Sequence, residues 1–203
     1  FVDKNKKYKN YRVHVSSSYK YHINKLVEKF YNVFGAKVSP KYDKKNHIWR
    51  IDFKSKYIFT LLTKIFEIPV GKKSKIVFIP TQIKNSSKSI QSCFIKGLID
   101  SDGCIYINKK LVKKLYGIYN YSNLCLNLRV RSKVLVEDSY NLLIQLGYKP
   151  RKFSYLGKNF CGNGKVKFYG VLLNKNDSEK YCREIGSMNP HKIKVINQFF
   201  SKV

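Results

Sequence analysis

Alternating hydrophobic and polar positions predict a short β-strand at two places in the first third of the chain. These are residues 11–15 and 48–53, where every second side chain is apolar or aromatic. Between them, apolar residues recur at helical spacing over residues 23–34, and Gly35 follows as a helix stop. A second helix is expected over residues 57–66. The first third therefore predicts strand, helix, strand and helix, in that order.

The same order of elements returns in the second half of the chain. Strands are expected at 105–108 and 124–131, followed by a helix over 134–146, a strand at 165–169 and a helix over 178–184. Gly147 aligns with Gly35, and Glu184-Ile185 aligns with Glu67-Ile68. The chain therefore contains a tandem repeat, with a longer turn around residues 159–164 in the second copy.

A strand at 76–79 and a long helix that begins near Ser89 are predicted between the two copies. One side of that helix carries small or apolar residues at helical spacing, namely Ile90, Cys93, Phe94, Gly97, Leu98 and Ser101. Because Gly97 and Ser101 are small and lie one turn apart, we expect another backbone to approach this side closely.

The predicted helix ends with two carboxylates. Asp100 and Asp102 occupy its last turn, and Gly103 follows as the C-terminal stop. Each carboxylate lies near the partial negative charge of the helix C-terminus and destabilises the helix by roughly 0.3–1 kcal/mol. A cation bound there would reverse this effect. The pattern is compatible with a cation site or with a solvated helix end beside a turn.

Positive charge dominates the composition. The 203 residues include 41 Lys and Arg against 12 Asp and Glu, a net charge of +29. Such an excess destabilises a compact protein unless a polyanion is nearby, so nucleic acid is the first candidate partner. A membrane surface is a weaker candidate, because the basic residues are interleaved with strand patterns. The hydrophobic fraction of 43% is typical of a folded protein with one large or two small domains.

The cysteines and histidines show no metal-ligand spacing. None of the five cysteines forms a Cys-x-x-Cys pair and all fall at apolar or small positions, which indicates reduced, buried cysteines in an intracellular protein. No apolar run reaches about 18 residues and no secretory signal is visible, so neither a membrane span nor secretion is expected. The only methionine is Met188 and the chain begins at Phe1, so we expect this chain to be cut from a longer one.

Residues 95–103, Ile-Lys-Gly-Leu-Ile-Asp-Ser-Asp-Gly, resemble the nine-residue signature of the LAGLIDADG homing endonucleases. With the repeat, the resemblance covers nearly the whole chain and implies the single-chain, two-half type of archaeal introns and inteins. The implied fold class is α+β, with two pseudo-symmetric αββαββα half-domains that form a DNA-binding saddle. The expected halves are residues 1–88 and 89–203. Because Phe1-Val2 aligns with the strand after the signature helix, the first signature helix is expected to be missing from this chain.

The resemblance also implies the catalytic residues. Asp102 stands where the family has its metal-binding carboxylate, with the Ser101 carbonyl beside it, for Mg²⁺ or another divalent cation. Asp100 is out of phase and is expected to cap or pair nearby. Arg131 or Lys133 would supply the cation that stabilises the transition state. Arg131 could instead contact a phosphate only.

Double-stranded DNA is the implied partner, and its expected contacts are outward-facing strand residues: Arg12, His14, Arg50, Asn127, Arg129, Lys165 and Lys167. Arg and Asn can discriminate bases in the major groove, whereas lysine-rich loops bind phosphates. Gly97, Leu98 and Ser101 are expected to contact a second signature helix. The protein would then be a pseudo-symmetric monomer, or would need a partner that supplies the missing helix.

Two functions remain open. The first is a site-specific DNA endonuclease that hydrolyses phosphodiester bonds at a long recognition site. The second is a DNA- or RNA-binding module without cleavage, such as an intron maturase or a degenerate homing endonuclease. The missing helix favours the second function, and so does Ser16-Ser17-Ser18, where the first copy lacks a catalytic lysine. A homodimer through the signature helix is a further possibility. Each of these would work in a prokaryotic cytoplasm or an organelle matrix.

Overall fold

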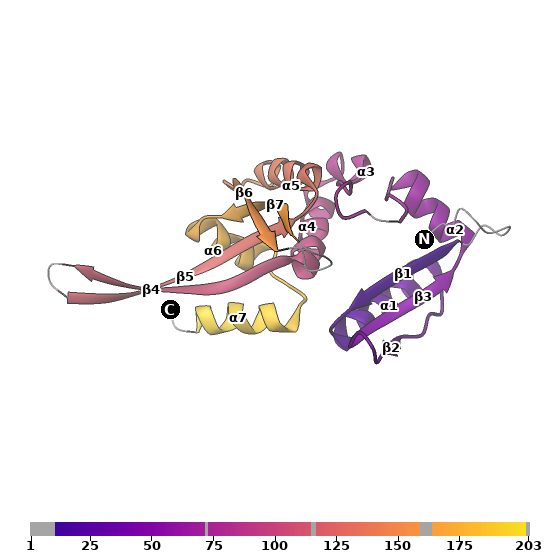
Figure 1. Ribbon diagram of the computed structural model, residues 1–203, viewed down its shortest axis with the longest axis horizontal. Coiled ribbons are helices and arrows are strands. Elements are labelled where there is room, and N and C mark those ends of the chain that lie inside the picture. The colour runs from indigo at the N-terminus through magenta and orange to yellow at the C-terminus, as the bar shows by residue number, and fades with distance from the viewer. Residues whose placement is uncertain (1–10, 72, 115–116, 159–163, 202–203) are drawn as a thin grey trace. The chain divides into compact units, whose positions relative to one another are not determined.

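The computed structural model describes residues 11–71, 73–114, 117–158 and 164–201, with their side chains except at 110, 112–114 and 117–120. The chain divides into two compact units, Phe1–Lys72 and Lys73–Val203 (Figure 1). Residues 73–88 thus lie in the second unit, and the half-domains expected at 1–88 and 89–203 stay a prediction.

The first unit is built on a three-stranded antiparallel sheet in the order β1-β3-β2. Its elements are β1 (Arg12–Ser17), α1 (Lys20–Phe34), β2 (Lys41–Asp43), β3 (Ile48–Lys54), α2 (Lys56–Thr60) and the π-helical turn η1 (Leu61–Ile65). Ile23 of α1, Ile51 of β3 and Ile58 of α2 are buried and form the core between the helices and the sheet. The alternation predicted for both long strands is confirmed.

The ends of the helices in the first unit follow the sequence signals. α1 ends at Gly35, which has a left-handed φ of 61° as expected for a glycine stop. The single helix predicted over 57–66 is divided instead into α2 and a π-helical turn. Within that turn the Thr63 hydroxyl donates a hydrogen bond of 2.8 Å to the carbonyl of Phe59. Glu67, with φ of 52°, then ends the helical segment.

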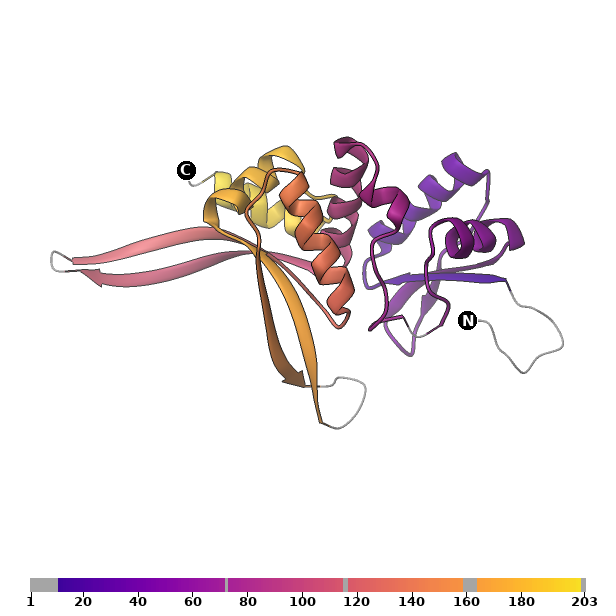
Figure 2. The same ribbon diagram turned by 90° about the horizontal axis from the view of Figure 1, so that it is seen from above.

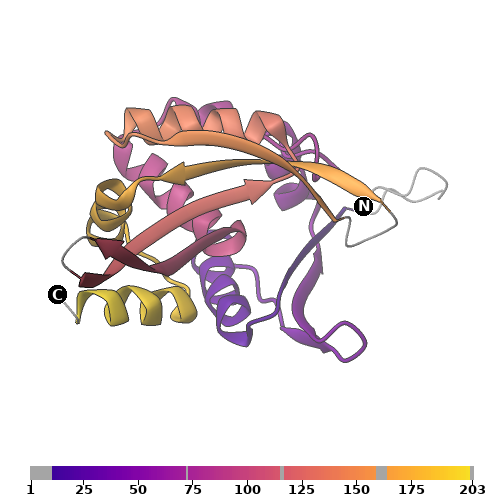
Figure 3. The same ribbon diagram turned by 60° about the vertical axis from the view of Figure 1, so that its left-hand side comes forward.

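The second unit is a four-stranded antiparallel sheet in the order β4-β5-β7-β6, with helices on one face. Its elements are α3 (Thr81–Lys84), α4 (Lys88–Asp102), β4 (Gly103–Lys114), β5 (Gly117–Val130), α5 (Lys133–Gln145), β6 (Arg151–Lys158), β7 (Lys165–Leu173), α6 (Lys175–Glu184) and α7 (Pro190–Phe200). In Figure 3 the strands face the viewer and α4 passes behind them. The helix predicted to begin near Ser89 is therefore α4.

The core of the second unit lies between β5 and the helices. Leu124, Leu126 and Leu128 alternate toward this core and are at most 2% exposed. Ile95 and Ile99 of α4 pack against them. β5 and β7 pair only over Leu126–Val130, so the outer parts of the β4–β5 and β6–β7 hairpins diverge (Figure 2).

Two strands formed where the sequence pattern did not predict them. β2 and β6 fall in the basic segments 37–45 and 149–158, and each is an edge strand of its sheet. Edge strands carry charged side chains, lysine above all, which prevents pairing with other chains and obscures the hydrophobic alternation. α7 was likewise not predicted.

The strand predicted at 76–79 is wrong. This segment is a turn followed by irregular backbone, and side chains of the α5 region satisfy its polar groups. The amide of Ile79 donates to the carboxylate of Asp138 at 2.9 Å, and the carbonyl of Val77 accepts from the Ser132 hydroxyl at 2.6 Å. Because these backbone groups already have partners, the segment needs no neighbouring strand to satisfy them. Its apolar side chains Val77 and Ile79 pack in the core of the second unit.

The tandem repeat is visible in the topology. The series β1-α1-β2-β3-α2 corresponds to β5-α5-β6-β7-α6, and the orders β1-β3-β2 and β5-β7-β6 agree. Gly35 and Gly147 both have left-handed backbones after equivalent helices. After the second helix of each copy, the residue with a left-handed backbone is Glu67 in the first copy and Gly186 in the second. Glu67 therefore corresponds to Gly186 in the structure, two residues after Glu184, with which the sequence pattern aligned it. α4 and β4 have no counterpart within residues 11–71, and the predicted role of Phe1-Val2 lies outside the described residues.

Gly103 ends α4 for a different reason from the one predicted. Its backbone is extended, with φ of −83° and ψ of 169°, and not left-handed. A Cβ at this position would lie 2.8 Å from both the Cα and the carbonyl oxygen of Ile99. The glycine is therefore needed for a close turn from the helix into β4.

Alanine at the two glycines of this segment should have opposite effects. Gly103→Ala forces backbone atoms apart and should lower the free energy of unfolding by about 1–3 kcal/mol. Gly97→Ala is the matched control, because within the second unit a Cβ there meets nothing within 4 Å. Alanine in a helix interior should stabilise by roughly 0.5–1 kcal/mol. Urea denaturation measures both, and equal effects would contradict this explanation.

Candidate functional site

The candidate metal ligand Asp102 is the last residue of α4, and its side chain is exposed. One carboxylate oxygen accepts a 3.3 Å hydrogen bond from the Ser101 hydroxyl, which also lies 3.1 Å from the carbonyl of Leu98. β4 begins at Gly103 opposite Leu128, so α4 ends beside the part of β5 that leads to Arg129. Asp102 is thus presented at the junction of helix end and sheet.

Asp100 has a different environment. Its carboxylate accepts hydrogen bonds from the Ser187 hydroxyl and, at 2.8 Å, from the amide of Met188. The side-chain amide of Asn189 donates to the carbonyl of Asp100 at 3.3 Å. The prediction that Asp100 pairs nearby is confirmed. Its bonds tie the end of α4 to the segment between α6 and α7.

A lysine that the sequence analysis missed completes this attachment. Lys192 of α7 donates from Nζ to the carbonyl oxygens of Ile99 and, at 2.9 Å, of Asp100. Burial lowers the pKa of Lys192, and the negative charges of Asp100 and Asp102 raise it by a smaller amount. A cation of the chain itself therefore offsets the negative end of the helix dipole.

A signal for Lys192 exists in the sequence. It lies one and two turns before Ile196 and Phe199, which are the buried residues of α7. A lysine on the buried side of an amphipathic helix needs a partner, and helix C-terminal carbonyls can provide one.

Part of the side of α4 predicted to face a second helix packs within its own unit, where Phe94 and Leu98 lie against the core. Gln91, Ile95 and Ile99 are the buried residues of α4. Gly97 and Ser101 are exposed, and Leu98 is half-buried. The predicted contact with another signature helix therefore stays a prediction.

The open face of the second sheet carries two of the predicted DNA contacts. Asn127 and Arg129 alternate with the core leucines of β5 and so point to the side without helices. Lys165 and Lys167 are exposed, but they share the opposite side of β7 with the buried Val171. The structure does not bring these four residues together on one face.

The two candidate catalytic cations lie where β5 turns into α5. Arg131 is half-buried just after β5, and Lys133 is the exposed first residue of α5. The Ser132 hydroxyl between them accepts from the amide of Leu135 and caps the helix. Both follow Arg129, the β5 residue beside the end of α4.

In the first unit, the predicted contacts Arg12, His14 and Arg50 converge on one carboxylate that the prediction did not include. Asp52 lies 3.0 Å from Arg12 Nη2, 2.8 Å from His14 Nδ1 and 3.4 Å from Arg50 Nε. Arg50 also contacts Asp43 at 3.1 Å. The open face of this sheet is therefore a charge cluster with part of its positive charge neutralised.

The titration of Asp52 reflects this cluster. Burial acts to raise the pKa of its carboxyl, but the hydrogen bond from His14 and the charges of His14, Arg12 and Arg50 outweigh burial and lower it. A carboxyl with a lowered pKa in the folded state stabilises the fold above its unfolded-state value. That contribution is lost as the pH falls through the folded-state pKa.

The described residues contain no preformed metal site made of protein side chains alone. No group of three His, Cys, Asp or Glu side chains gathers there, so an ion at Asp102 would take its other ligands from backbone, water or phosphate oxygens. The described cysteines 93, 104, 125 and 182 are free thiols, but only Cys182 is buried; Cys93 is exposed, so the expected burial is wrong for it. No helix of the described segments has the length and apolar character to cross a membrane.

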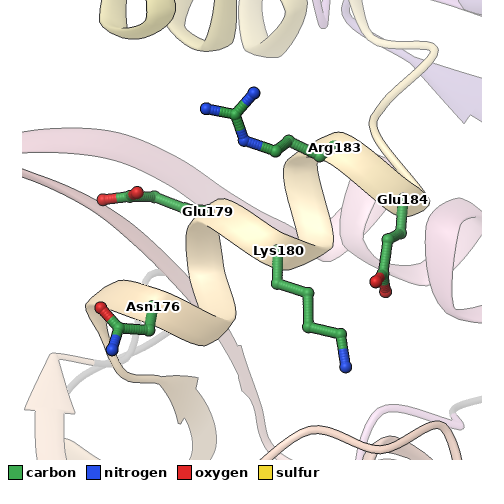
Figure 4. A pocket seen from close by; sticks show the side chains of 5 residues that line it. All are labelled: Asn176, Glu179, Lys180, Arg183 and Glu184. Atoms are coloured by element: carbon green, nitrogen blue, oxygen red, sulfur yellow. The ribbon is translucent and has the colours of Figure 1, made fainter. Parts of the chain in front are cut away.

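A surface hollow lies along α6. Asn176, Glu179, Lys180, Arg183 and Glu184 line it, all from one helix, and their side chains diverge (Figure 4). Several have structural contacts: Glu184 accepts a 2.8 Å hydrogen bond from Tyr148, and Arg183 stacks on Phe200 at 4.1 Å.

Removing the Lys192 ammonium should loosen the end of α4. Lys192→Met keeps the apolar stem but leaves two carbonyls without their donor, so the free energy of unfolding should fall by about 1–3 kcal/mol. Lys194→Met, at an exposed position of the same helix, is the control and should change stability by less than about 0.5 kcal/mol. Equal urea midpoints for the two variants would refute the role of Lys192.

The Asp52 cluster should make stability depend on acid. At neutral pH Asp52→Asn should unfold at a lower temperature than wild type, because the ion pairs with Arg12 and His14 are lost. The difference should shrink as the pH falls below the ordinary range of an aspartate carboxyl, because the lowered pKa of Asp52 delays its protonation to more acidic pH. Glu28→Gln, an exposed carboxylate, is the control. A difference that stays constant with pH would exclude this assignment.

Comparison with known sequences gives one distant relative. No protein-family model matches the chain. The replicative DNA helicase DnaB of Synechocystis sp. is 23% identical in an alignment of 175 residues that covers 83% of this chain but only 19% of the helicase. The chain thus spans a small part of its curated relative.

Comparison with solved structures identifies the fold. The homing endonuclease I-DmoI in complex with DNA and Ca has a TM-score of 0.61 at 18% identity, covering 98% of this chain and 88% of that one. Its complex with DNA and Mn has a TM-score of 0.57 at 20% identity, covering 90% and 85%. The LAGLIDADG homing endonuclease I-LtrWI, bound to target DNA, has a TM-score of 0.54 at 11% identity, covering 94% and 78%. The chain therefore has the fold of the LAGLIDADG homing endonucleases.

Proposed function

We propose that this protein is a site-specific DNA endonuclease of the homing type, which hydrolyses phosphodiester bonds with a divalent metal ion. The observation that carries the proposal is the exposed Asp102 at the end of α4, beside the open face of the second sheet. The fold and the net charge of +29 support DNA as the substrate.

The residues at the end of α4 fit a hard cation. Asp102 offers an exposed carboxylate, while Asp100 is occupied by Ser187 and Met188. Mg²⁺ prefers one or two carboxylates together with water and phosphate oxygens. When bound, the ion would polarise the scissile phosphate and lower the pKa of its water ligand. Lys192 and Asp100 would keep Asp102 in place.

DNA would lie along the open faces of the sheets. Asn127 and Arg129 on β5 are suited to base edges, and Lys165 and Lys167 to phosphates. Arg131 or Lys133 would stabilise charge at the scissile phosphate. Because many phosphates would be neutralised, binding should weaken steeply with salt.

The first unit would contribute binding more than catalysis. Its Ser16-Ser17-Ser18 stretch has no lysine, and the Ser17 hydroxyl accepts from the amide of Tyr19. Asp52 also neutralises part of the charge of Arg12 and His14. We therefore expect the two DNA strands to be cut at different rates.

A second signature helix would pack on Gly97, Leu98 and Ser101. Residues 11–71 contain no such helix, so a partner would supply it. Similarity to a small part of a helicase sequence is the relation expected if an endonuclease of the intein kind lies within a host protein.

The second candidate function is a nucleic-acid-binding module without cleavage. Two observations favour it: the serine stretch of the first unit, and the absence of any group of three His, Cys, Asp or Glu side chains among the described residues. This alternative predicts tight, salt-sensitive binding and no cleavage.

Incubation of plasmid libraries with Mg²⁺ or with EDTA tests the proposal. Linear product is expected with Mg²⁺ only. Asp102→Asn should lower the cleavage rate by about 10²-fold or more while DNA affinity stays nearly unchanged. Glu28→Gln is the matched control, an exposed carboxylate distant in sequence from the site.

Two results would count against the proposal. Cleavage by the Asp102→Asn variant would show that the metal site is elsewhere. Salt-sensitive binding by wild type, with no metal-dependent product from any plasmid, would favour the binding module.

A further inference from the structure

Three aromatic rings cover the open side of the β6–β7 hairpin. The rings of Phe153 and Tyr155 stack with centroids 6.3 Å apart at an interplanar angle of 15°. Those of Tyr155 and Phe168 stack at 5.4 Å and 16°. Tyr155 is 40% exposed, so this aromatic surface is in contact with solvent. A stacked row of rings on an open sheet face needs an explanation.

Two glycines allow the rings to lie against the strands. A Cβ on Gly170 would overlap the ring of Phe153. A Cβ on Gly157 would lie 3.0 Å from Phe168 Cε2 and 3.1 Å from Tyr155 Cε2. The sequence thus omits side chains at the positions where the rings rest on the backbone.

The strand register places the aromatic surface on the same face as the predicted base contacts. Gly170 pairs with Arg129 on one side and with Phe153 on the other, and Tyr155 pairs with Phe168. Arg151 lies on this face too, one alternate position before Phe153. Val171 and Leu173, on the opposite face, are buried under the helices. The rings are therefore bordered by arginines and lie outside the core.

The outer part of this hairpin is a ribbon of two strands. β7 pairs with β5 only from Tyr169 onward, so Tyr155 and Phe168 lie beyond the shared sheet. Such a ribbon fits the major groove of DNA. Lys165 and Lys167 lie on its reverse face, from which their long side chains can reach backbone phosphates.

We propose that this aromatic surface recognises the 5-methyl groups of thymine in the major groove. The thymine methyl is the apolar group that the major groove exposes, and apolar side chains contact it directly. Arg129 and Arg151 at the border provide charge complementarity to DNA. The inference rests on the proposed function, and it adds a preference for thymine beneath the β6–β7 hairpin.

Another occupant, a second copy of this chain, fits less well. Each copy carries a charge of +29, so two copies would repel one another across a face bordered by arginines. Self-association through the rings is therefore an outcome that the test must exclude.

Two duplex libraries of the same random sequences provide the probe, one with thymine and the other with uracil, which lacks the methyl group. Wild type should bind the thymine library more tightly, by about fourfold for each methyl contacted. Tyr155→Thr keeps a strand-forming residue and should reduce the ratio of the two affinities, because the contact with the methyl group is lost.

Two control variants separate other effects. Tyr57→Thr, at a tyrosine that is 73% exposed in the first unit, should leave the preference unchanged. Lys167→Met should weaken binding to both libraries equally, because it removes a phosphate contact.

Equal affinity of wild type for the two libraries would overturn the inference while the proposed DNA binding stands. No binding to either library would overturn both. A wild-type dimer that becomes a monomer in the Tyr155→Thr variant, with no difference between the libraries, would show that the rings form a self-association surface.

Discussion

The contact between α7 and the last turn of α4 is the constraint on which the candidate site depends. A helix that ends in two carboxylates is unfavourable by itself, because both lie near the negative end of its dipole. Lys192 donates to two of the terminal carbonyls, and Asp100 is held by Ser187 and Met188. With these groups satisfied, Asp102 is left exposed at a fixed position. The metal chemistry proposed for Asp102 requires this division of roles between the two carboxylates.

The two units reuse one topology with different surfaces. In the first unit, Arg12, His14 and Arg50 gather around Asp52, so the open face is ordered and partly neutralised. In the second unit the open face combines Asn127 and Arg129 with stacked aromatic rings. Among the described residues, only the second unit contains α4 and β4, and Asp102 is the last residue of α4. The proposed metal chemistry therefore belongs to the second unit.

Much of the fold could be predicted from the sequence, because α1, α4 and β3 have clear periodicity and Gly35 marks the end of α1. The edge strands β2 and β6 could not, since their lysines hide the alternation. At the site, the separate role of Asp100 was predicted from its phase on the helix, but its partners lie more than eighty residues away in the chain. The partners of Asp52 could not be predicted either, because its contact with His14 depends on the register between β1 and β3. Long-range pairing of this kind is not contained in local patterns.

The central claim is that Asp102 binds a divalent metal ion shared with DNA, and anomalous scattering tests it most directly. Crystals of the protein with Mn²⁺ and a duplex selected from the plasmid library should show an anomalous peak beside the Asp102 carboxylate. The same crystals should show none at Asp100. A peak elsewhere, or none within coordination distance of Asp102, would contradict the account.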